Sequence, residues 1–482
     1  MPDKTIPLCA PLDQRNTTAY ASLTAGNDTQ YKACLFTEIQ NSAIGIKQLF
    51  CQKRPGLSAT MTPSSGNKGT LVCVCLSTKT LTVFHVSSAY TLFSGTTSCG
   101  NIDATPIAIS PITLAGVEYA LISTTSSGWY INDDSIDTAN TFTGDTHSNT
   151  TIDNISSTTG LLSGQAISGS GIAANTRIQS VDSATAITIT IAATATASTV
   201  TITRDKVAKI IDTDYITAAP NNKTGRFAEM DGFIFQTSSS GRIYNSDINS
   251  ISSWSASNYI PSLSTSSIFS SNGYIVGIGQ QSGFGSGVIQ FFRNTGNAFG
   301  SPLSLVKELT INIGGAYAPM TLCRDVIYFV SNLSGSGVPS GVFALRGTAI
   351  TKISNNVIDK IIFAGGGSTT ILDAYIIGGK VFLHVGTNSE SSNNISIVYD
   401  VENKIWSQDN YPFSIRIDQG ESFVTCVATN NTGGKVYSMD PASTVYQDDS
   451  VAYTMTIQTQ PYYLNDGDPF FIDEITLVAD TQ

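Results

Sequence analysis

The sequence predicts an all-β protein with a β-propeller-like main body and a small inserted β module. Only 13% of the 482 residues are Asp, Glu, Lys or Arg, and long helix-forming runs of Leu, Ala, Glu and Lys are missing. Short strands rich in β-branched and aromatic residues recur along the chain instead, which favours sheets. The chain also exceeds the usual size of a single domain, so we expect a repetitive fold.

Residues 225–254 contain the unit that recurs. Apolar residues at 227–236 flank the polar pair Asp231-Gly232, and a second strand at 242–247 follows a run of serines. Similar short apolar–aromatic strands return at residues 341–345, 396–400 and 435–440. A small antiparallel sheet of this kind buries both of its faces only against neighbouring sheets. The weak repeat therefore indicates propeller blades.

The beginning of the chain predicts neither secretion nor membrane insertion. No basic segment followed by an apolar core is found there, and no apolar run reaches membrane-spanning length. The eight cysteines are Cys9, Cys34, Cys51, Cys73, Cys75, Cys99, Cys323 and Cys426. A disulfide framework is one interpretation, but a chain with a core of its own favours reduced, buried thiols.

Cys73 and Cys75 lie two residues apart and so share one face of an expected strand. Their separation of roughly 6.5–7 Å is poor for a disulfide. A metal pair is conceivable, but the chain has only three histidines, His85, His147 and His384, and no second cysteine pair with ligand spacing. We therefore expect no metal and no cofactor.

The basic pair Lys53-Arg54 precedes Pro55-Gly56, which favours a type II turn. The pair is the candidate contact for an acidic partner surface. On physical grounds alone, a solvated turn flank is the favoured interpretation.

Strands are expected in the first part of the chain at residues 71–76, 81–86, 107–112, 117–123 and 129–131. From residue 143 the composition changes to Ser, Thr, Ala, Gly and Ile with almost no charge. Residues 187–191 and 200–203 alternate β-branched apolar residues with Thr, which predicts strands. We interpret residues 143–205 as an inserted β module that projects outward, where insertions are tolerated.

Further strands are expected at 274–280, 288–293, 316–320, 326–331, 341–345, 349–353, 374–377, 380–385, 395–401, 422–428, 436–439, 453–459 and 470–478. Residues 356–362 form the one segment where a helical period competes. The expected organisation is an N-terminal segment with the first propeller strands (1–142), the module (143–205), the remaining blades (206–440) and a C-terminal β segment (441–482).

Catalytic residues cannot be named from the pattern. Three carboxylate pairs two residues apart could serve a glycosidase or a cation site, but all lie in expected turns, where solvated carboxylates are usual. These pairs are Asp212 with Asp214, Glu229 with Asp231, and Asp466 with Asp468. The glycine-rich stretch 282–287 is followed by a strand rather than the helix that a phosphate-binding loop needs. The chain is therefore not expected to be an enzyme.

The formal net charge of −11 argues against a general nucleic-acid clamp, because phosphate neutralisation needs surplus Lys and Arg. An acidic wall could still line a channel through which DNA passes without sticking.

Several segments, in order, resemble the tail-nozzle family of short-tailed bacteriophages, also called packaged DNA stabilisation or tail hub proteins. The matching segments are KRPGL at 53–57, GRFAEMDGFIFQ with GRIYNSDINSISSW at 225–254, YIVGIGQQ with VIQFF at 274–292, IGGAYAPMTLCRDVIYFVS at 313–331, GVFALRGTAITKISNNVIDKII at 341–362, and GGKVFLHV with SIVYDVENKIW up to 406. Their serial order is more specific than any single segment.

The resemblance implies a β-propeller-like subunit in a homo-oligomeric ring of the virion tail, with a hexamer expected, assembled in the host cytoplasm. The ring would lie below the portal and adaptor rings, continue the DNA channel and help retain packaged DNA. Its lower end would meet a tail needle or plug, and its flank would meet fibres or spikes. Members usually continue into further C-terminal β structure, so the segment 441–482 is expected to be reduced or incomplete. A receptor- or glycan-binding tail protein is the alternative.

Overall fold

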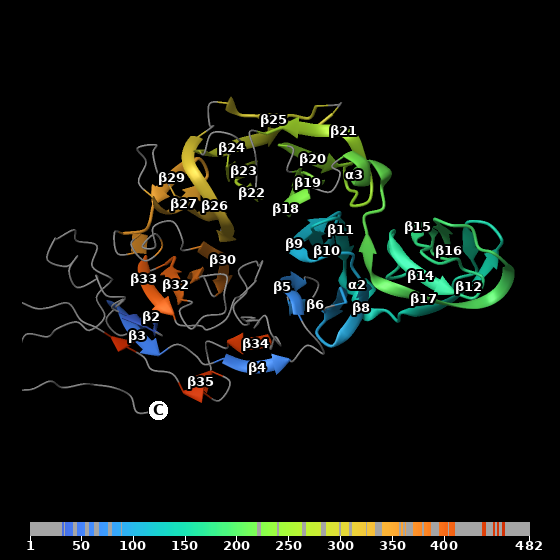
Figure 1. The fold of residues 1–482 in the computed structure, drawn as a ribbon, viewed down its shortest axis with the longest axis horizontal. Coiled ribbons are helices and arrows are strands. Elements are labelled where there is room, and N and C mark those ends of the chain that lie inside the picture. Colours follow the sequence, from blue (N-terminus) through green and yellow to red (C-terminus); the bar gives the residue numbers. More distant parts are fainter. Residues whose placement is uncertain are drawn as a thin grey trace, which may run out of the picture.

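The computed structural model describes the backbone of residues 31–409, with internal gaps, and of the short segments 436–439, 447–448, 451–452 and 456–457. Side chains are described between residues 84 and 407, also with gaps, and the stretch 89–216 is continuous. Nearly all of this chain is antiparallel β-structure (Figure 1).

Successive four-stranded antiparallel units form the main body. The first unit comprises β5 (Asn67–Cys75), β6 (Thr80–Ser87), β7 (Thr91–Ser94) and β8 (Thr97–Asn101). The second comprises β9 (Pro106–Leu114), β10 (Val117–Thr124), β11 (Gly128–Ile131) and the end of β17 (Thr196–Lys209). We call these units blades 1 and 2.

Blades 3 to 6 follow, and the third strand of blade 4 also pairs with the first strand of blade 5, so these two blades share one sheet. Blade 3 contains β18 (Lys223–Met230), β19 (Phe233–Ser238), β20 (Arg242–Ser246) and β21 (Trp254–Pro261). Blade 4 contains β22 (Ser267–Ser271), β23 (Tyr274–Gln280), β24 (Ser286–Asn294) and β25 (Leu303–Leu305). Blade 5 contains β26 (Ile311–Cys323), β27 (Val326–Asn332), β28 (Gly341–Arg346) and β29 (Ala349–Lys352). Blade 6 contains β30 (Thr370–Ile377), β31 (Lys380–Gly386), β32 (Ile395–Asp400) and β33 (Ile405–Asp409).

Strands from the two ends of the described chain lie side by side between blade 6 and blade 1 (Figure 1). The pair β2 (Cys34–Asn41) and β3 (Ile46–Lys53) is a hairpin. β4 (Leu57–Met61) pairs with β34 (Val436–Met439), and β1 (Tyr31–Lys32) pairs with both β33 and β37 (Thr456–Ile457). The short pair β35 (Gln447–Asp448) and β36 (Val451–Ala452) lies in the same region of the chain. Early and late segments thus close the body together.

Blades 2, 3 and 4 each pack their two faces into two different hydrophobic clusters. In β10, Ile122 belongs to the cluster between blades 1 and 2, whereas its neighbour Leu121 belongs to the cluster between blades 2 and 3. In β24, Phe292 packs toward blade 3 and Phe291 toward blade 5. Since successive side chains of a strand point to opposite faces, these strands are apolar on both faces. This is why the sequence shows short apolar runs rather than strict alternation.

Side-chain hydrogen bonds add to the apolar contacts between blades. The Ser110 hydroxyl of blade 2 accepts from the backbone N–H of Phe227 in blade 3 at 3.0 Å. The Asn294 amide of blade 4 donates to Asp231 of blade 3 at 2.9 Å, and the Trp406 indole of blade 6 donates to the carbonyl of Ile353 at 3.0 Å.

The inserted module leaves blade 2 after its third strand and returns as its fourth. It consists of β12 (Thr141–His147), β13 (Thr151–Asp153), β14 (Gln165–Gly169), β15 (Ile178–Ser183), β16 (Ala186–Ile189) and the first part of β17. We refer to residues 141–203 as the module. Figure 1 shows it outside the ring of blades, beside blades 1 and 2.

The prediction of an all-β, β-propeller-like body with a small inserted β module is confirmed. The residue bounds proposed for the four parts of the chain stay predictions. The structure adds two short helices that the sequence pattern did not predict, α2 (Asp133–Asp137) and α3 (Thr213–Ala218).

Candidate functional site

The densest group of polar side chains in the described part of the chain lies where the module joins blade 2. We call this region the neck and define it as residues 103, 124–140, 161–165, 177 and 203–209. The backbone N–H of Arg204 donates to the carbonyl of Asn140 at 2.8 Å, so the two ends of the module are adjacent. The neck is the one place where a candidate site can be built from described contacts.

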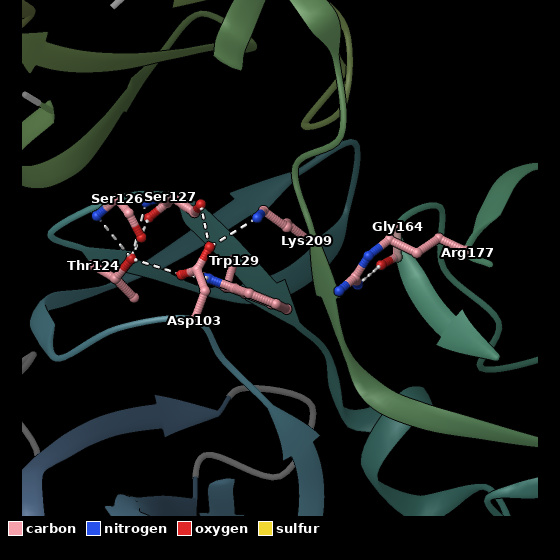
Figure 2. Close-up of polar contacts among 8 residues, drawn as sticks. All are labelled: Asp103, Thr124, Ser126, Ser127, Trp129, Gly164, Arg177 and Lys209. Carbon is pink, nitrogen blue, oxygen red and sulfur yellow. Dashed lines mark hydrogen bonds and ion pairs between the residues drawn. The ribbon is translucent and has the colours of Figure 1, made fainter. Parts of the chain in front are cut away.

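Asp103, in the loop between β8 and β9, is held by four donors (Figure 2). Its carboxylate accepts hydrogen bonds from Ser127 Oγ at 2.6 Å, Lys209 Nζ at 2.8 Å, Trp129 Nε1 at 3.1 Å and Thr124 Oγ1 at 3.3 Å. Thr124 also accepts from the backbone N–H of Ser127 at 2.9 Å, which fixes the turn between β10 and β11.

Burial alone would raise the pKa of Asp103, but the hydrogen bonds from Lys209 and Ser127 outweigh it and lower the pKa from 3.8 to about 2. A general acid or base that works near neutral pH needs a pKa close to that pH. Asp103 is therefore a permanently charged anchor rather than a proton-transfer group.

The Trp129 ring belongs to the cluster between blades 1 and 2 and contacts one cation from the module and one from blade 2. The guanidinium carbon of Arg177, from the module, is 5.4 Å from the ring centroid, and Lys209 Nζ is 5.5 Å from it. Both distances are within the range of cation–π attraction. Arg177 also donates to the carbonyl of Gly164 at 2.7 Å (Figure 2). Burial lowers the pKa of Arg177, and the charges of Asp205 and Asp103 oppose that effect.

The loop at residues 161–165 of the module closes on blade 2 at the same point. The Tyr130 hydroxyl of β11 donates to the carbonyl of Ser163. Gly164 has a φ of +89°, and a Cβ at this position would lie 1.8 Å from the carbonyl oxygen of Lys209. Only glycine allows this approach of the two backbones.

A second group of contacts fixes α2, the segment that leads into the module. Lys206 Nζ donates to the carbonyls of Ile136 and Thr138, the latter at 3.0 Å. Arg204 donates to Ser135 Oγ at 3.1 Å and to the Ser135 carbonyl at 3.2 Å. Both cations therefore satisfy carbonyls at the C-terminal end of the helix, where positive charge is favourable.

The sequence-predicted partner contact falls outside the described side chains. Lys53 is the last residue of β3 and pairs with Cys34, while Arg54 lies outside the described residues. The suggestion that Lys53 and Arg54 contact a partner stays a prediction. The glycine-rich stretch 282–287 lies largely outside the described residues, and β24 begins at Ser286.

Two of the three carboxylate pairs are described, and each carboxylate has its own backbone or side-chain donor. Asp212 Oδ1 accepts from the backbone N–H groups of Asp214 and Tyr215 at the start of α3, and Asp214 accepts from the backbone N–H of Ala256. Glu229 accepts from the backbone N–H of Gly232, within the hairpin turn. These side chains stabilise turns and a helix start. The third pair, at 466 and 468, lies outside the described residues.

Sequence reasoning did not find the neck residues. Asp103 and Lys209 are 106 positions apart, and Arg204 and Ser135 are 69 apart. The usable signal was Trp129, which precedes the change in composition at residue 143, because a large aromatic residue near the base of an insertion can pack against it. Among the described residues no group of three or more His, Cys, Asp or Glu could hold a metal ion. No helix in the described part of the chain is long and apolar enough to cross a membrane.

No family model matches the chain, and no curated protein matches it. Distant likenesses to solved structures do exist. The computationally designed Ika8 protein has 7% identity and a TM-score of 0.38, with 80% of this chain and 99% of that chain covered. BamB from Moraxella catarrhalis has 11% identity and a TM-score of 0.37, with coverages of 79% and 99%.

The WD40 domain of Pan2 from Neurospora crassa has 8% identity and a TM-score of 0.34, with 80% of this chain and 92% of that chain covered. Likenesses at this level carry no argument about function. The arrangement of four-stranded sheets itself makes the chain an all-β protein of the β-propeller type.

Proposed function

We propose that this protein is a structural subunit of a short bacteriophage tail, the nozzle ring below the portal and adaptor. The observation that carries the proposal is the ordered series of segments that resembles the tail-nozzle family, which runs from residue 53 to residue 406. The propeller-like body is the kind of subunit that this role implies. In this role the protein is a homo-oligomer, with a hexamer expected, and not an enzyme.

Charge supports a channel role. The formal net charge of −11 disfavours stable binding to the DNA backbone, since such binding depends on Lys and Arg that displace counterions. An acidic bore would repel phosphate and let the genome pass during ejection. The ring would then retain packaged DNA through closure by a needle or plug, and fibres or spikes would attach to its flank.

The polar chemistry of the described residues also favours a structural role. Asp103 is saturated with donors and its pKa is about 2, and the carboxylates of Asp212 and Glu229 hold turns. Catalytic carboxylates are instead set at a pKa suited to proton transfer and have an accessible reaction partner.

Particle mass tests the proposal directly. The purified chain, alone and mixed with the portal and adaptor proteins of the same phage, is measured by light scattering and imaged by negative stain. We expect a ring with a central channel, formed either spontaneously or on the adaptor. A double charge reversal, Lys53→Glu with Arg54→Glu, is expected to weaken recruitment if the basic pair contacts the adaptor. The matched control is Arg346→Glu at an exposed position of β28.

A receptor- or glycan-binding tail protein is the second candidate. The observation that favours it is the module, which lies outside the ring of blades and is rich in Ser and Thr (Figure 1). A protein that stays monomeric in the presence of tail components but binds host glycans would establish this candidate and overturn the nozzle proposal.

A further inference from the structure

The module has a hydrophobic core of its own. Its buried residues are Ile152, Ile155, Leu161, Ile167, Ile178, Ile187, Ile189, Ala193, Val200 and Ile202. None of these belongs to the clusters on either side of blade 2. A unit with a separate core, joined by two chain segments, moves relative to its neighbour unless the junction prevents it. The contacts of the neck therefore determine whether the module moves relative to blade 2.

We infer that the module is a rigid arm, locked to blade 2 in a single orientation by the clamp of Arg177 and Lys209 on Trp129. The inference stands independently of the proposed function, because it rests only on the contacts of the neck.

The first support is the continuity of β17. This strand of 14 residues pairs with β12 at one end, where Thr203 lies opposite Thr141, and with β11 at the other, where Lys209 lies opposite Trp129. On its other edge it pairs with β14, from Gly169 to Gln165. One strand is thus shared by the module and the blade, and it cannot bend at the junction without breaking these ladders.

The second support is the clamp itself. Arg177 comes from the module, whereas Lys209 and Trp129 are paired residues of blade 2, so the contact between Arg177 and the Trp129 ring crosses the junction. Asp103 holds Lys209 and the Trp129 indole N–H from the blade side. Movement of the module would withdraw Arg177 from the Trp129 ring, and Arg177 would keep only the carbonyl of Gly164, which belongs to the module itself.

The third support is a pair of buried cations of β17 that contact α2. Arg204 is 3% exposed and Lys206 is 9% exposed, and both reach across to carbonyls of the helix that leads into the module. Gln165 Nε2 donates to Ser135 Oγ at 2.9 Å and to the carbonyl of Lys206 at 3.0 Å. The outgoing segment, the returning strand and the loop of the module are therefore tied in one buried network, which is costly to open because its groups would lose their partners.

Amide hydrogen exchange by mass spectrometry of the full chain tests the lock. We expect residues 161–165 and 203–209 to exchange as slowly as the blade strand β10. Arg177→Ala is expected to raise their exchange by about tenfold, since it removes a cation–π contact and a charged hydrogen bond. Exchange in β16 of the module and in β10 is expected to stay unchanged. The matched control is Arg346→Ala, which removes an exposed arginine of β28.

If Arg177→Ala unfolds the module, β16 will also exchange fast, and exchange in the neck will no longer report the lock alone. Two further measurements cover this case. Arg177→Lys keeps a cation near Trp129 and should give a smaller rise confined to the neck. Small-angle scattering of the wild-type chain should fit one arrangement of module and propeller. The inference is overturned if the wild-type neck exchanges as fast as exposed loops, if scattering requires several arrangements, or if neither Arg177 variant changes exchange in the neck.

Discussion

At the scale of single residues, Asp103 shows how a carboxylate can be structural. Its four donors lie in the end of β10 with the turn that follows it, in β11 and in β17. One of them, Lys209, also contacts the Trp129 ring. Removing the charge would leave the ammonium of Lys209 without its partner in a half-buried position, which is more costly than losing an ordinary hydrogen bond.

We therefore expect Asp103→Asn to destabilise the protein by about 1–3 kcal/mol, measured as a lower melting temperature. The control is Asp247→Asn, in an exposed turn where the carboxylate accepts from Ser253, and its effect should stay within about 0.5 kcal/mol. Equal effects of the two substitutions would contradict the anchoring role of Asp103.

His85 is a buried residue with an unusual environment. Its ring stacks on Phe93 with centroids 4.8 Å apart, and its Nδ1 finds no hydrogen-bond partner among the described residues. Burial lowers the pKa of His85 below 6.5, so the folded protein favours the neutral ring.

Stability should consequently depend on pH in a definite direction. Above pH 6.5, His85 is neutral in both the folded and the unfolded protein, and the stability associated with the neutral ring is fully present. As the pH falls from 6.5 through the lowered pKa of folded His85, this stability is lost, because the unfolded protein takes up the proton first. We expect the melting temperature to fall between about pH 7 and pH 5, and to fall less in His85→Phe. His147→Gln, at a more exposed histidine paired with Asp153, is the control. An unchanged slope in His85→Phe would exclude His85 as the cause.

At the scale of elements, the hairpin of β18 and β19 shows what local sequence determines. Asp231 has a φ of 55° and Gly232 a φ of 81°, the two positive values of a type I′ turn. The sequence analysis treated residues 227–236 as one strand, which is wrong, because β18 ends at Met230 and β19 begins at Phe233. The Asp-Gly pair between two apolar runs was the available signal for this turn. The close packing of the turn was not predictable, since a Cβ on Gly232 would lie 2.7 Å from Asn249 Oδ1, which belongs to another turn.

Gly232→Ala should accordingly cost more than the same change in an open turn. Gly273, in the hairpin of β22 and β23, has a φ of +77° but nothing within 4 Å of an added Cβ. We expect about 1 kcal/mol of destabilisation for Gly273→Ala and about 2 kcal/mol for Gly232→Ala. The difference between the two melting temperatures reports the crowding at Gly232. If Gly273→Ala were the more damaging change, the packing argument would be wrong.

The same comparison shows how far sequence reasoning reaches. Many strands of the described blades could be predicted, since apolar runs such as 326–331 and 341–345 correspond to β27 and β28. The strands β7, β8, β21 and β22 were not expected from the sequence. The helices α2 and α3 could not, since five or six residues are too few to show a helical period. The neck could not be predicted either, because its partners meet only after the module has folded back onto blade 2.

At the scale of the whole molecule, stability is shared between neighbouring blades, whereas the module is additional. Each described cluster of the body takes residues from two successive blades, as with Ile234 of blade 3 beside Tyr130 of blade 2. Blade 2, 3 or 4 therefore cannot be removed without opening two clusters. The module can, because its buried core is separate and its ends meet at Asn140 and Arg204.

We expect that replacing residues 141–203 by a two-residue Asn-Gly turn leaves the propeller folded. The free energy of unfolding should fall by about 1–3 kcal/mol, and the melting temperature with it, because Trp129 loses the Arg177 contact and α2 loses the Gln165 contact. Amide exchange in β10 and β23 should remain slow, as measured by mass spectrometry. Deletion of residues 223–261, which removes blade 3, is the matched control and should abolish folding, since it opens the clusters on both sides of that blade. A soluble but unfolded product of the module deletion would mean that the propeller cannot fold without the module. Fast exchange in β10 alone would mean that only blade 2 depends on the module.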